Sequence, residues 1–210
     1  MNKDDFSQKT TYSFQDLLGI VAILRSENGC SWDRAQTHKS IRNNFVEEVY
    51  ELCEGIDTEN MTLLCEELGD VLLHAVFHIQ IAEENGEFTK EEVFSGICNK
   101  MIHRHPHVFS DSTSLPASWD EIKRKEKGEK KLSESLERIS KSLPALMRAQ
   151  KIIQKTKDLA INLPINSDES LLIGEKLYAL CKECTEQNID SEEALNAYLN
   201  KIIKDCTKYE

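Results

Sequence analysis

The pattern of apolar and polar positions predicts a chain made of long helices. Over most of the sequence, apolar residues recur at intervals of three or four positions, which is the period of an amphipathic helix. Glycine and proline, the residues that most often interrupt helices, number only 8 and 4 among 210 residues. The sequence therefore predicts an all-α fold.

Two neighbouring segments, residues 44–56 and 60–84, show this pattern most clearly. A helix turns by about 100° per residue, so each segment gathers its apolar residues into one stripe. The first stripe consists of Ile41, Phe45, Val49, Leu52 and Ile56, and the second of Leu64, Leu68, Val71, Leu72, Ala75 and Ile79. We expect the two helices to pack against each other through these stripes.

Acidic residues lie inside or beside both stripes. The four concerned are Glu48, Glu51, Glu67 and Asp70, and His74 and His78 run along the same edge as the last two. Packing the stripes together brings the carboxylates close, where like charges repel by roughly 0.2–0.5 kcal/mol per pair and burial adds a further cost. No Lys or Arg occurs between Arg42 and Lys90 to neutralise them. Because Mg²⁺ prefers carboxylate oxygens, we interpret the four acids as metal ligands.

The acidity of the chain is concentrated in this region. Twelve of its 37 acids lie between Arg42 and Lys90, whereas the rest of the chain has 25 acids against 26 basic residues. One alternative is that these helices merely present a solvated acidic face, but apolar residues flank Glu48 and Glu67. A di-iron carboxylate bundle is a second alternative, but it requires Glu-x-x-His motifs, and this sequence has none.

The segment before the acidic helices is predicted to be a helix followed by a loop. Ser13 is a suitable N-cap for a helix that runs to about Glu27. A loop at residues 29–38 follows. In this loop we expect Trp32 to fold onto the helices rather than to stack on a nucleobase, and His38 to make a structural hydrogen bond rather than to bind metal.

A capping box, Thr89-x-x-Glu92, opens the helix that follows the acidic pair. We expect its apolar residues to face inward, and these are Val93, Ile97 and Met101. Lys100 and Arg104 lie four residues apart and share one face, which is either an ordinary solvated basic face or a clamp for phosphate groups. The helix ends at Pro106.

The rest of the chain is predicted to hold no catalytic constellation. A short charged helix from Ser118 carries Trp119 and Lys123 four residues apart, and a Lys/Glu-rich linker follows. The tail, from about residue 133 to residue 210, has the pattern of three helices.

Composition and charge indicate the binding partners and the compartment of the protein. A pI near 5.1 argues against binding to nucleic-acid polymers or to a membrane surface. No apolar run is long enough to span a membrane, and the first residues lack an apolar signal segment. Seven cysteines, most of them within apolar helical stretches, indicate reduced, buried thiols. We therefore expect a cytoplasmic protein without a membrane or nucleic-acid partner.

Several ordered motifs resemble those of the MazG family of all-α nucleoside triphosphate pyrophosphohydrolases. In order they are Gly29-Cys30-Ser31-Trp32-Asp33, Gln36-Thr37-His38, Glu47-Glu48-x-x-Glu51, Glu66-Glu67-Leu68-Gly69-Asp70, Arg104-His105-Pro106-His107-Val108-Phe109 and Trp119-x-x-x-Lys123. The chain departs from the family pattern at Ser31, where proline is usual, and at His103, where a second arginine is common.

The resemblance implies a helical bundle with its metal site between two antiparallel acidic helices. It implies a MazG-like catalytic domain at residues 13–127, a linker at 128–142 and a degenerate, truncated second repeat at 143–210. The tail motifs Met147-Arg148-Ala149-Gln150-Lys151 and Gly174-Glu175-Lys176-Leu177-Tyr178 resemble parts of such a repeat without its acids.

The implied activity is hydrolysis of (d)NTPs between the α- and β-phosphates, with Mg²⁺ or alternatively Mn²⁺, in nucleotide-pool house-cleaning. Glu48, Glu51, Glu67 and Asp70 would hold the metal, Glu47 and Lys123 would take part in catalysis, and Asn44, Lys100, Arg104 and Trp119 would contact the nucleotide. A homodimer is expected. The alternatives are a non-catalytic module that binds nucleotides or a protein partner, and a ferritin-like metal protein.

Overall fold

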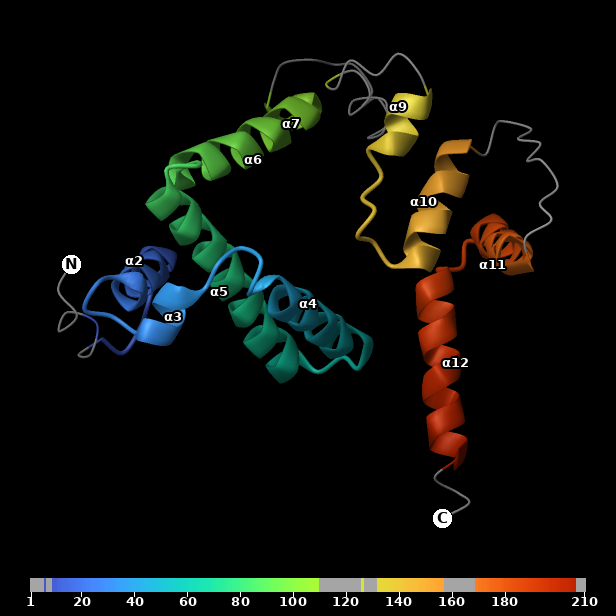
Figure 1. Cartoon of the computed structure of the whole chain (residues 1–210), viewed down its shortest axis with the longest axis horizontal. Helices are drawn as coiled ribbons and strands as arrows, with labels where there is room; N and C mark the ends of the chain where they lie inside the picture. Colours follow the sequence, from blue (N-terminus) through green and yellow to red (C-terminus); the bar gives the residue numbers. More distant parts are fainter. Residues whose placement is uncertain (1–5, 7–8, 110–125, 127–131, 157–168, 207–210) are drawn as a thin grey trace. The chain divides into compact units, whose positions relative to one another are not determined.

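The computed structural model describes residues 6, 9–109, 126, 132–156 and 169–206, and the regular structure among these residues is entirely helical (Figure 1). This confirms the predicted all-α class. The chain divides into two compact units, Met1–Leu115 and Pro116–Glu210, which are described separately below.

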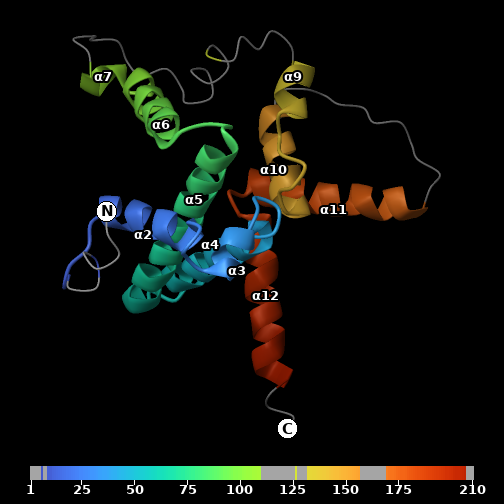
Figure 2. The ribbon, with the colours of Figure 1, turned by 60° about the vertical axis from the view of Figure 1, so that its left-hand side comes forward.

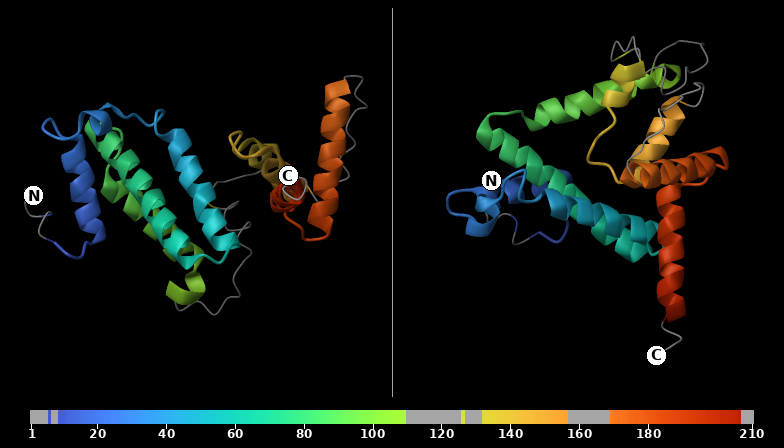
Figure 3. Two further views of the ribbon diagram at one scale, coloured as in Figure 1. Left: turned by 90° about the horizontal axis from the view of Figure 1, so that it is seen from below. Right: turned by 45° about the vertical axis from the view of Figure 1, so that its right-hand side comes forward.

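The first unit is built around one long helix. Its helices are α2 (Phe14–Arg25), α3 (Ser31–Ala35), α4 (Arg42–Asp57), α5 (Met61–Asn85), α6 (Lys90–Arg104) and α7 (Pro106–Phe109). Helices α4 and α5 form an antiparallel hairpin, and α2 packs on another side of α5, so that α5 lies between them (Figure 3, left). The two predicted acidic helices are confirmed, each within three residues of its expected ends.

The ends of these helices follow from local sequence. Ser13 caps α2: its hydroxyl accepts a hydrogen bond from the Asp16 backbone N–H, while the Asp16 carboxylate accepts one from the Ser13 N–H at 2.8 Å. Thr89 and Glu92 form the same reciprocal pair at the start of α6. Gly86 ends α5 with φ of 67°, a left-handed conformation that glycine adopts most readily. The chain then turns sharply into α6 (Figure 2).

The core of the first unit joins α2, the start of α4 and the second half of α5. It consists of Val21, Ile41, Val76, Phe77 and Ile81. Val21 and Val76 are almost completely buried, and burial of each such side chain stabilises the fold by about 1.5–3 kcal/mol.

The face of α4 that meets α5 differs from the expected stripe. Its buried or half-buried members are Ile41, Phe45, Glu48, Leu52 and Gly55. These five lie within about 40° of one line along an ideal helix, whereas Val49 and Ile56 lie further round. The prediction that Val49 and Ile56 are inward-facing is therefore wrong: they are 41% and 52% exposed in the chain. Glu48 occupies the inner face instead.

The same rotation applies to α5. Its residues facing α4 include Leu64, Glu67, Val71, His74 and His78, all buried or half-buried. The expected inward residues Leu68 and Leu72 are exposed in the chain. On α6, Val93 and Ile97 are also exposed, contrary to expectation, whereas Met101 is half-buried.

A glycine allows the close approach of α4 and α5 near their turn. A Cβ added at Gly55 would lie 2.8 Å from the backbone nitrogen of Leu64, which is closer than real Cβ atoms approach. The turn is stabilised by the Asn60 N–H, which donates to the Gly55 carbonyl at 2.9 Å. Asn60 also caps α5 through its side chain, which accepts from the Leu63 N–H.

The second unit contains α9 (Leu132–Glu137), α10 (Ala145–Thr156), α11 (Glu169–Glu186) and α12 (Ser191–Cys206). The three predicted tail helices correspond to α10, α11 and α12, whereas α9 lies inside the range predicted as a linker. Gln150, buried on α10, holds the turn between α11 and α12. Its amide donates to the Ile189 carbonyl at 2.8 Å, and its carbonyl accepts from the Ser191 N–H at 3.1 Å.

Cysteine exposure departs from the sequence expectation. Cys30, Cys53, Cys65 and Cys98 are exposed, so the prediction of buried thiols is wrong for these four, while Cys181 is buried. Among the described residues, no helix is both long and apolar enough to cross a membrane.

Candidate functional site

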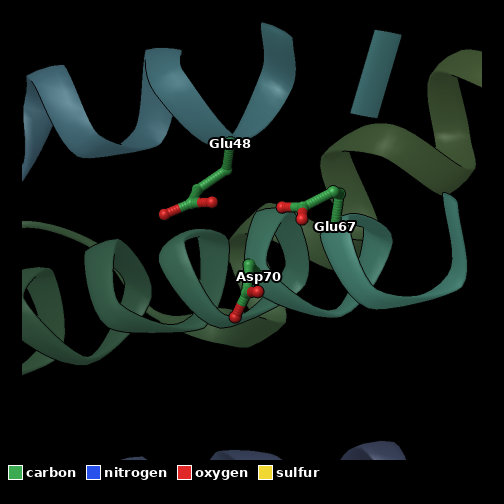
Figure 4. Close-up of side chains that lie close together, drawn as sticks. All are labelled: Glu48, Glu67 and Asp70. Carbon is green, nitrogen blue, oxygen red and sulfur yellow. The ribbon is translucent and has the colours of Figure 1, made fainter. Parts of the chain in front are cut away.

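Three carboxylates meet between α4 and α5. Glu48 comes from α4, and Glu67 and Asp70 come from α5, with one ligand oxygen of each lying within 4.8 Å of the others. Figure 4 shows Glu48 reaching from one helix toward the two acids on the facing helix. Here "carboxylate cluster" means these three residues.

The helical register explains why the cluster forms. Glu67 and Asp70 are three residues apart, so they project from neighbouring turns of α5. Glu48 lies on the inner face of α4, between the half-buried Phe45 and Leu52. Packing of the two inner faces therefore brings the three side chains to one place, as the sequence predicted for Glu48, Glu67 and Asp70.

Glu67 is the most deeply buried member of the cluster. Glu67 is only 6% exposed, and its Oε2 atom is buried without a hydrogen-bond partner among the described residues. Burial raises the pKa of the Glu67 carboxyl, and the charges of Glu51, Glu48 and Asp70 raise it further. A buried carboxylate in such surroundings is unfavourable unless a proton or a cation compensates it.

The cluster fits a hard divalent cation. Its donors are carboxylate oxygens, which Mg²⁺ prefers. Three carboxylate ligands leave other coordination positions of the ion open for water or phosphate oxygens. The unpartnered Oε2 of Glu67 supplies a ligand atom that no other group in the described chain uses. The chemistry of the donor set therefore suits the metal that the sequence implied.

Glu51 and Glu47 lie outside the cluster. Both are exposed on α4, and Glu51 is not among the residues whose ligand atoms lie within 4.8 Å of one another. The charge of Glu51 nevertheless contributes to the raised pKa of Glu67, so the two carboxylates interact electrostatically. Three of the four predicted metal ligands thus lie together, and the fourth is nearby.

The predicted nucleotide-contacting residues have different surroundings. Asn44 on α4 and Lys100 on α6 are exposed, whereas Arg104 is buried, although it shares a helix face with Lys100. Trp119 and Lys123 lie outside the residues that the structure describes.

A group of aromatic and histidine rings adjoins the cluster. His38, from the segment before α4, approaches His78 on α5 with 2.7 Å between the two Nδ1 atoms, and its Nε2 lies 3.1 Å from Glu87. The short Nδ1–Nδ1 distance requires one nitrogen to donate and the other to accept. The expectation that His38 makes a structural hydrogen bond is therefore confirmed.

The ring of His74 lies closest to the cluster. It stacks on Phe45 with a centroid distance of 5.7 Å, and its Nε2 atom lies 3.7 Å from Oε1 of Glu48. In the sequence, His74 was placed along the edge of the α5 stripe, but no role was predicted for it. Its position four residues after Asp70, on the same helix face, was the signal that could have indicated its closeness to the acids.

The segment at residues 29–38 was predicted to be a loop, but it contains a short helix. Residues 31–35 form the short helix α3, and Trp32 is 65% exposed, so the expectation that it folds onto the helices is wrong. Arg25 holds this segment: its Nη1 donates to the carbonyls of Asp33 and Gln36, while its Nε and Nη2 donate to the Glu84 carboxylate.

Comparison with known proteins matches this region to a described family. The model of the MazG nucleotide pyrophosphohydrolase domain matches residues 36–109, which include α4, α5, α6 and α7 and hence the whole carboxylate cluster.

Individual relatives extend the similarity. The chain is 37% identical to a Thermotoga maritima protein named nucleoside triphosphate pyrophosphohydrolase/pyrophosphatase MazG, over 94% of this chain and 85% of that protein. It is 41% identical to the Escherichia coli K12 nucleoside triphosphate pyrophosphohydrolase, over 70% of this chain and 58% of that protein. It is 45% identical to the Bacillus subtilis protein YabN, over 67% of this chain but only 30% of that protein.

Proposed function

The chain belongs to the MazG family of nucleotide pyrophosphohydrolase enzymes, and from this premise we propose that it hydrolyses (d)NTPs between the α- and β-phosphates. The products would be a (d)NMP and pyrophosphate. The 37% identical Thermotoga relative, which the alignment covers over 85% of its length, is named for nucleoside triphosphate pyrophosphohydrolysis and supports this activity. A house-cleaning role in the cytoplasmic nucleotide pool fits the same chemistry.

The observation that carries the proposal is the carboxylate cluster. Glu48, Glu67 and Asp70 lie inside the matched region, and one oxygen of Glu67 is buried without a hydrogen-bond partner in the part of the chain that the structure describes. A protein that only needed a stable hairpin would gain from apolar residues at these inner positions. The acids therefore favour a role in binding a cation.

Mg²⁺, with Mn²⁺ as the alternative, would be held by Glu48, Glu67 and Asp70, with Glu51 as a further ligand. When bound, the metal neutralises the triphosphate charge and lowers the pKa of water. The chain contributes an acidic hairpin with no competing Lys or Arg between Arg42 and Lys90.

Other residues would bind and orient the substrate. Glu47, exposed beside Glu48 on α4, would orient the attacking water and accept its proton. Lys100 and Arg104 on α6, together with Lys123, would bind phosphate oxygens. Asn44 would contact the nucleotide one turn before Glu48, and Trp119 would stack near the base.

A homodimer is part of the proposal. The outer faces of the α4–α5 hairpin and of α6 expose many large apolar side chains, which is more than an isolated chain normally leaves in water. They are Val46, Val49, Tyr50, Ile56, Met61, Leu68, Leu72, Val93, Ile97 and Ile102. Pairing with a second copy would bury these side chains and stabilise the hairpin that carries the site.

Product analysis tests the proposed reaction. The full-length protein is incubated with a panel of NTPs and dNTPs, with and without Mg²⁺, and the products are separated by ion-exchange chromatography. A monophosphate and pyrophosphate, formed only with Mg²⁺, are expected. A diphosphate and orthophosphate would reject cleavage between the α- and β-phosphates. Binding of nucleotide without turnover would favour a non-catalytic binding module.

A further inference from the structure

We infer that His74 is a positioning residue that orients the carboxylate of Glu48 by presenting its Nε2–H to Oε1. The inference rests on the proposed metal site, because it concerns how one ligand of that site is held. It adds a hydrogen-bond donor beside a cluster that otherwise consists of mutually repelling acids.

The imidazole of His74 lies close to the Glu48 carboxylate. His74 Nε2 lies 3.7 Å from Glu48 Oε1, and the two side chains are 15% and 22% exposed. This separation exceeds the usual hydrogen-bond range, but a movement of about 1 Å closes it. The Glu48 side chain has rotatable bonds that permit such a movement without a change in the backbone.

The two ring nitrogens of His74 have different surroundings. His74 Nδ1 is buried and has no hydrogen-bond partner among the described residues. A buried N–H without an acceptor is costly, whereas an N–H that faces a carboxylate is favourable. A hydrogen on Nε2, on the side of Glu48, is therefore favoured over a hydrogen on Nδ1 alone.

Packing against aromatic side chains holds the His74 ring in place. The His74 ring stacks on Phe45 at 20° between planes, and Phe45 lies three residues before Glu48 on α4. Phe45 also contacts His78, whose ring stacks on His38 at 6°. The contact with Phe45 thus holds the His74 ring in place, as a residue that orients a ligand must be held.

The need for an orienting group follows from the cluster itself. Glu67 and Asp70 repel the Glu48 carboxylate, and Glu48 is accessible enough to turn toward solvent before metal arrives. Hydrogen bonds from outside the ligand set commonly hold ligating carboxylates, and loss of such a partner costs about 10–100-fold in metal affinity. His74 is placed to perform this function for Glu48.

Two variants of the full-length protein test the inference through metal binding in the absence of nucleotide. Mn²⁺ is titrated into the protein, and free Mn²⁺ is followed by electron paramagnetic resonance. His74→Leu removes the donor but keeps an apolar body against Phe45, and we expect its Kd for Mn²⁺ to rise by about 10–100-fold. His74→Gln keeps an N–H donor, and we expect its Kd to remain within about threefold of the unaltered protein.

The outcomes separate this inference from the proposed site. If the unaltered protein binds Mn²⁺ and His74→Leu binds it equally well, the positioning role is wrong and the metal site stands. If both variants lose affinity alike, the imidazole only fills space or serves another purpose, and the positioning role is again wrong. If the unaltered protein binds no more Mn²⁺ than an Asp70→Asn variant, the proposed metal site fails and the inference fails with it.

Discussion

Glu48 on α4 and Glu67 on α5 bring carboxylate oxygens within 4.8 Å of each other, on the inner faces of one helical hairpin. No Lys or Arg occurs between Arg42 and Lys90 to neutralise them. One oxygen of Glu67 is buried without a hydrogen-bond partner among the described residues. The two acids therefore oppose the packing that brings them together, and a bound cation would remove that conflict.

Substitution of Glu67 by Gln should have opposite effects on stability and on activity. The change removes a repelling charge from a buried position, and the new amide N–H can donate to Glu48 or Asp70. We expect the melting temperature of the metal-free protein to rise by a few degrees. Removal of a metal ligand should lower kcat/KM by more than about 100-fold, the upper end of the effect of losing an outer-sphere partner.

Glu66 provides the matched control, since it neighbours Glu67 on α5 but is exposed and lies outside the cluster. Glu66→Gln should change the melting temperature and kcat/KM little. A Glu67→Gln protein that is less stable than the unaltered one without metal would show that the carboxylate is compensated in some other way.

Arg25→Lys should destabilise the first unit. Arg25 is buried and satisfies a bidentate contact with Glu84 as well as the carbonyls of Asp33 and Gln36. A single ammonium cannot reach all of these acceptors. We expect a loss of about 1.5–3 kcal/mol in the free energy of unfolding, measured by urea denaturation with circular dichroism, because the lost hydrogen bonds involve a charged group.

An exposed ion pair in the second unit serves as the comparison. Lys182 and Glu186 are one turn apart on α11, 4.0 Å apart and mostly in solvent. Lys182→Ala should cost no more than about 0.5 kcal/mol. Equal losses of stability for Arg25→Lys and Lys182→Ala would contradict the stabilising role assigned to the Arg25 hydrogen bonds.

The stability of the protein should fall as the pH drops below the ordinary pKa of histidine. Burial lowers the pKa of His78 below its usual 6.5, and the neighbouring His38 and His74 lower it further. In the unfolded chain His78 takes up a proton near pH 6.5, before the folded protein does. Protonation therefore favours unfolding from that pH downward, until the lowered pKa of the folded state is reached.

His78→Phe isolates this contribution. Phenylalanine keeps a ring beside Phe45 but neither titrates nor bonds to His38, so at neutral pH the variant should lose about 0.5–1.5 kcal/mol. The gap between the two proteins should narrow as the pH falls from 7.5 to 5. Thermal unfolding of both proteins across this pH range measures the difference in stability. Glu87, the other partner of His38, is left unchanged in both. A gap that widens at low pH would contradict the sign of the pKa shift.

Leu72→Glu should break the proposed dimer. Leu72 is 42% exposed on the outer face of α5, so in the single chain the change meets solvent and should not disturb the core. In a dimer formed through this face, it buries charge at the interface. Light scattering should give twice 24.0 kDa for the unaltered protein and 24.0 kDa for the variant.

Leu180 on α11 is exposed in the second unit and offers a matched substitution. Leu180→Glu should leave the dimer intact. A monomeric unaltered protein, or a dimer that only Leu180→Glu dissociates, would refute pairing through the hairpin.

Local sequence signals predicted the four longer helices of the first unit, α2, α4, α5 and α6, but not the short helices α3 and α7. The capping boxes at Ser13 and Thr89 fix where α2 and α6 begin, because each involves residues three apart. The register of Glu67 with Asp70 is also local, so their position side by side on α5 could be predicted from the sequence.

The remaining prediction errors concern contacts between residues that are far apart in the sequence. Val49 lies at the edge of the apolar stripe, and only the rotation of α4 against α5 decides that it faces outward while Glu48 faces inward. The contact between Arg25 and Glu84 joins residues 59 apart, so no periodicity reveals it. Because this contact could not be predicted, nothing in the sequence indicated that residues 31–35 form a helix on which Trp32 is exposed.

The most direct test of the central claim is ³¹P nuclear magnetic resonance of one dNTP during turnover with Mg²⁺. It compares the unaltered protein with Glu51→Gln and with Glu54→Gln, a substitution of another exposed acid on α4. We predict equal amounts of dNMP and pyrophosphate for the unaltered protein and for Glu54→Gln, and no turnover for Glu51→Gln, with helical circular dichroism unchanged. Formation of dNDP and orthophosphate, or full activity of Glu51→Gln, would contradict the account.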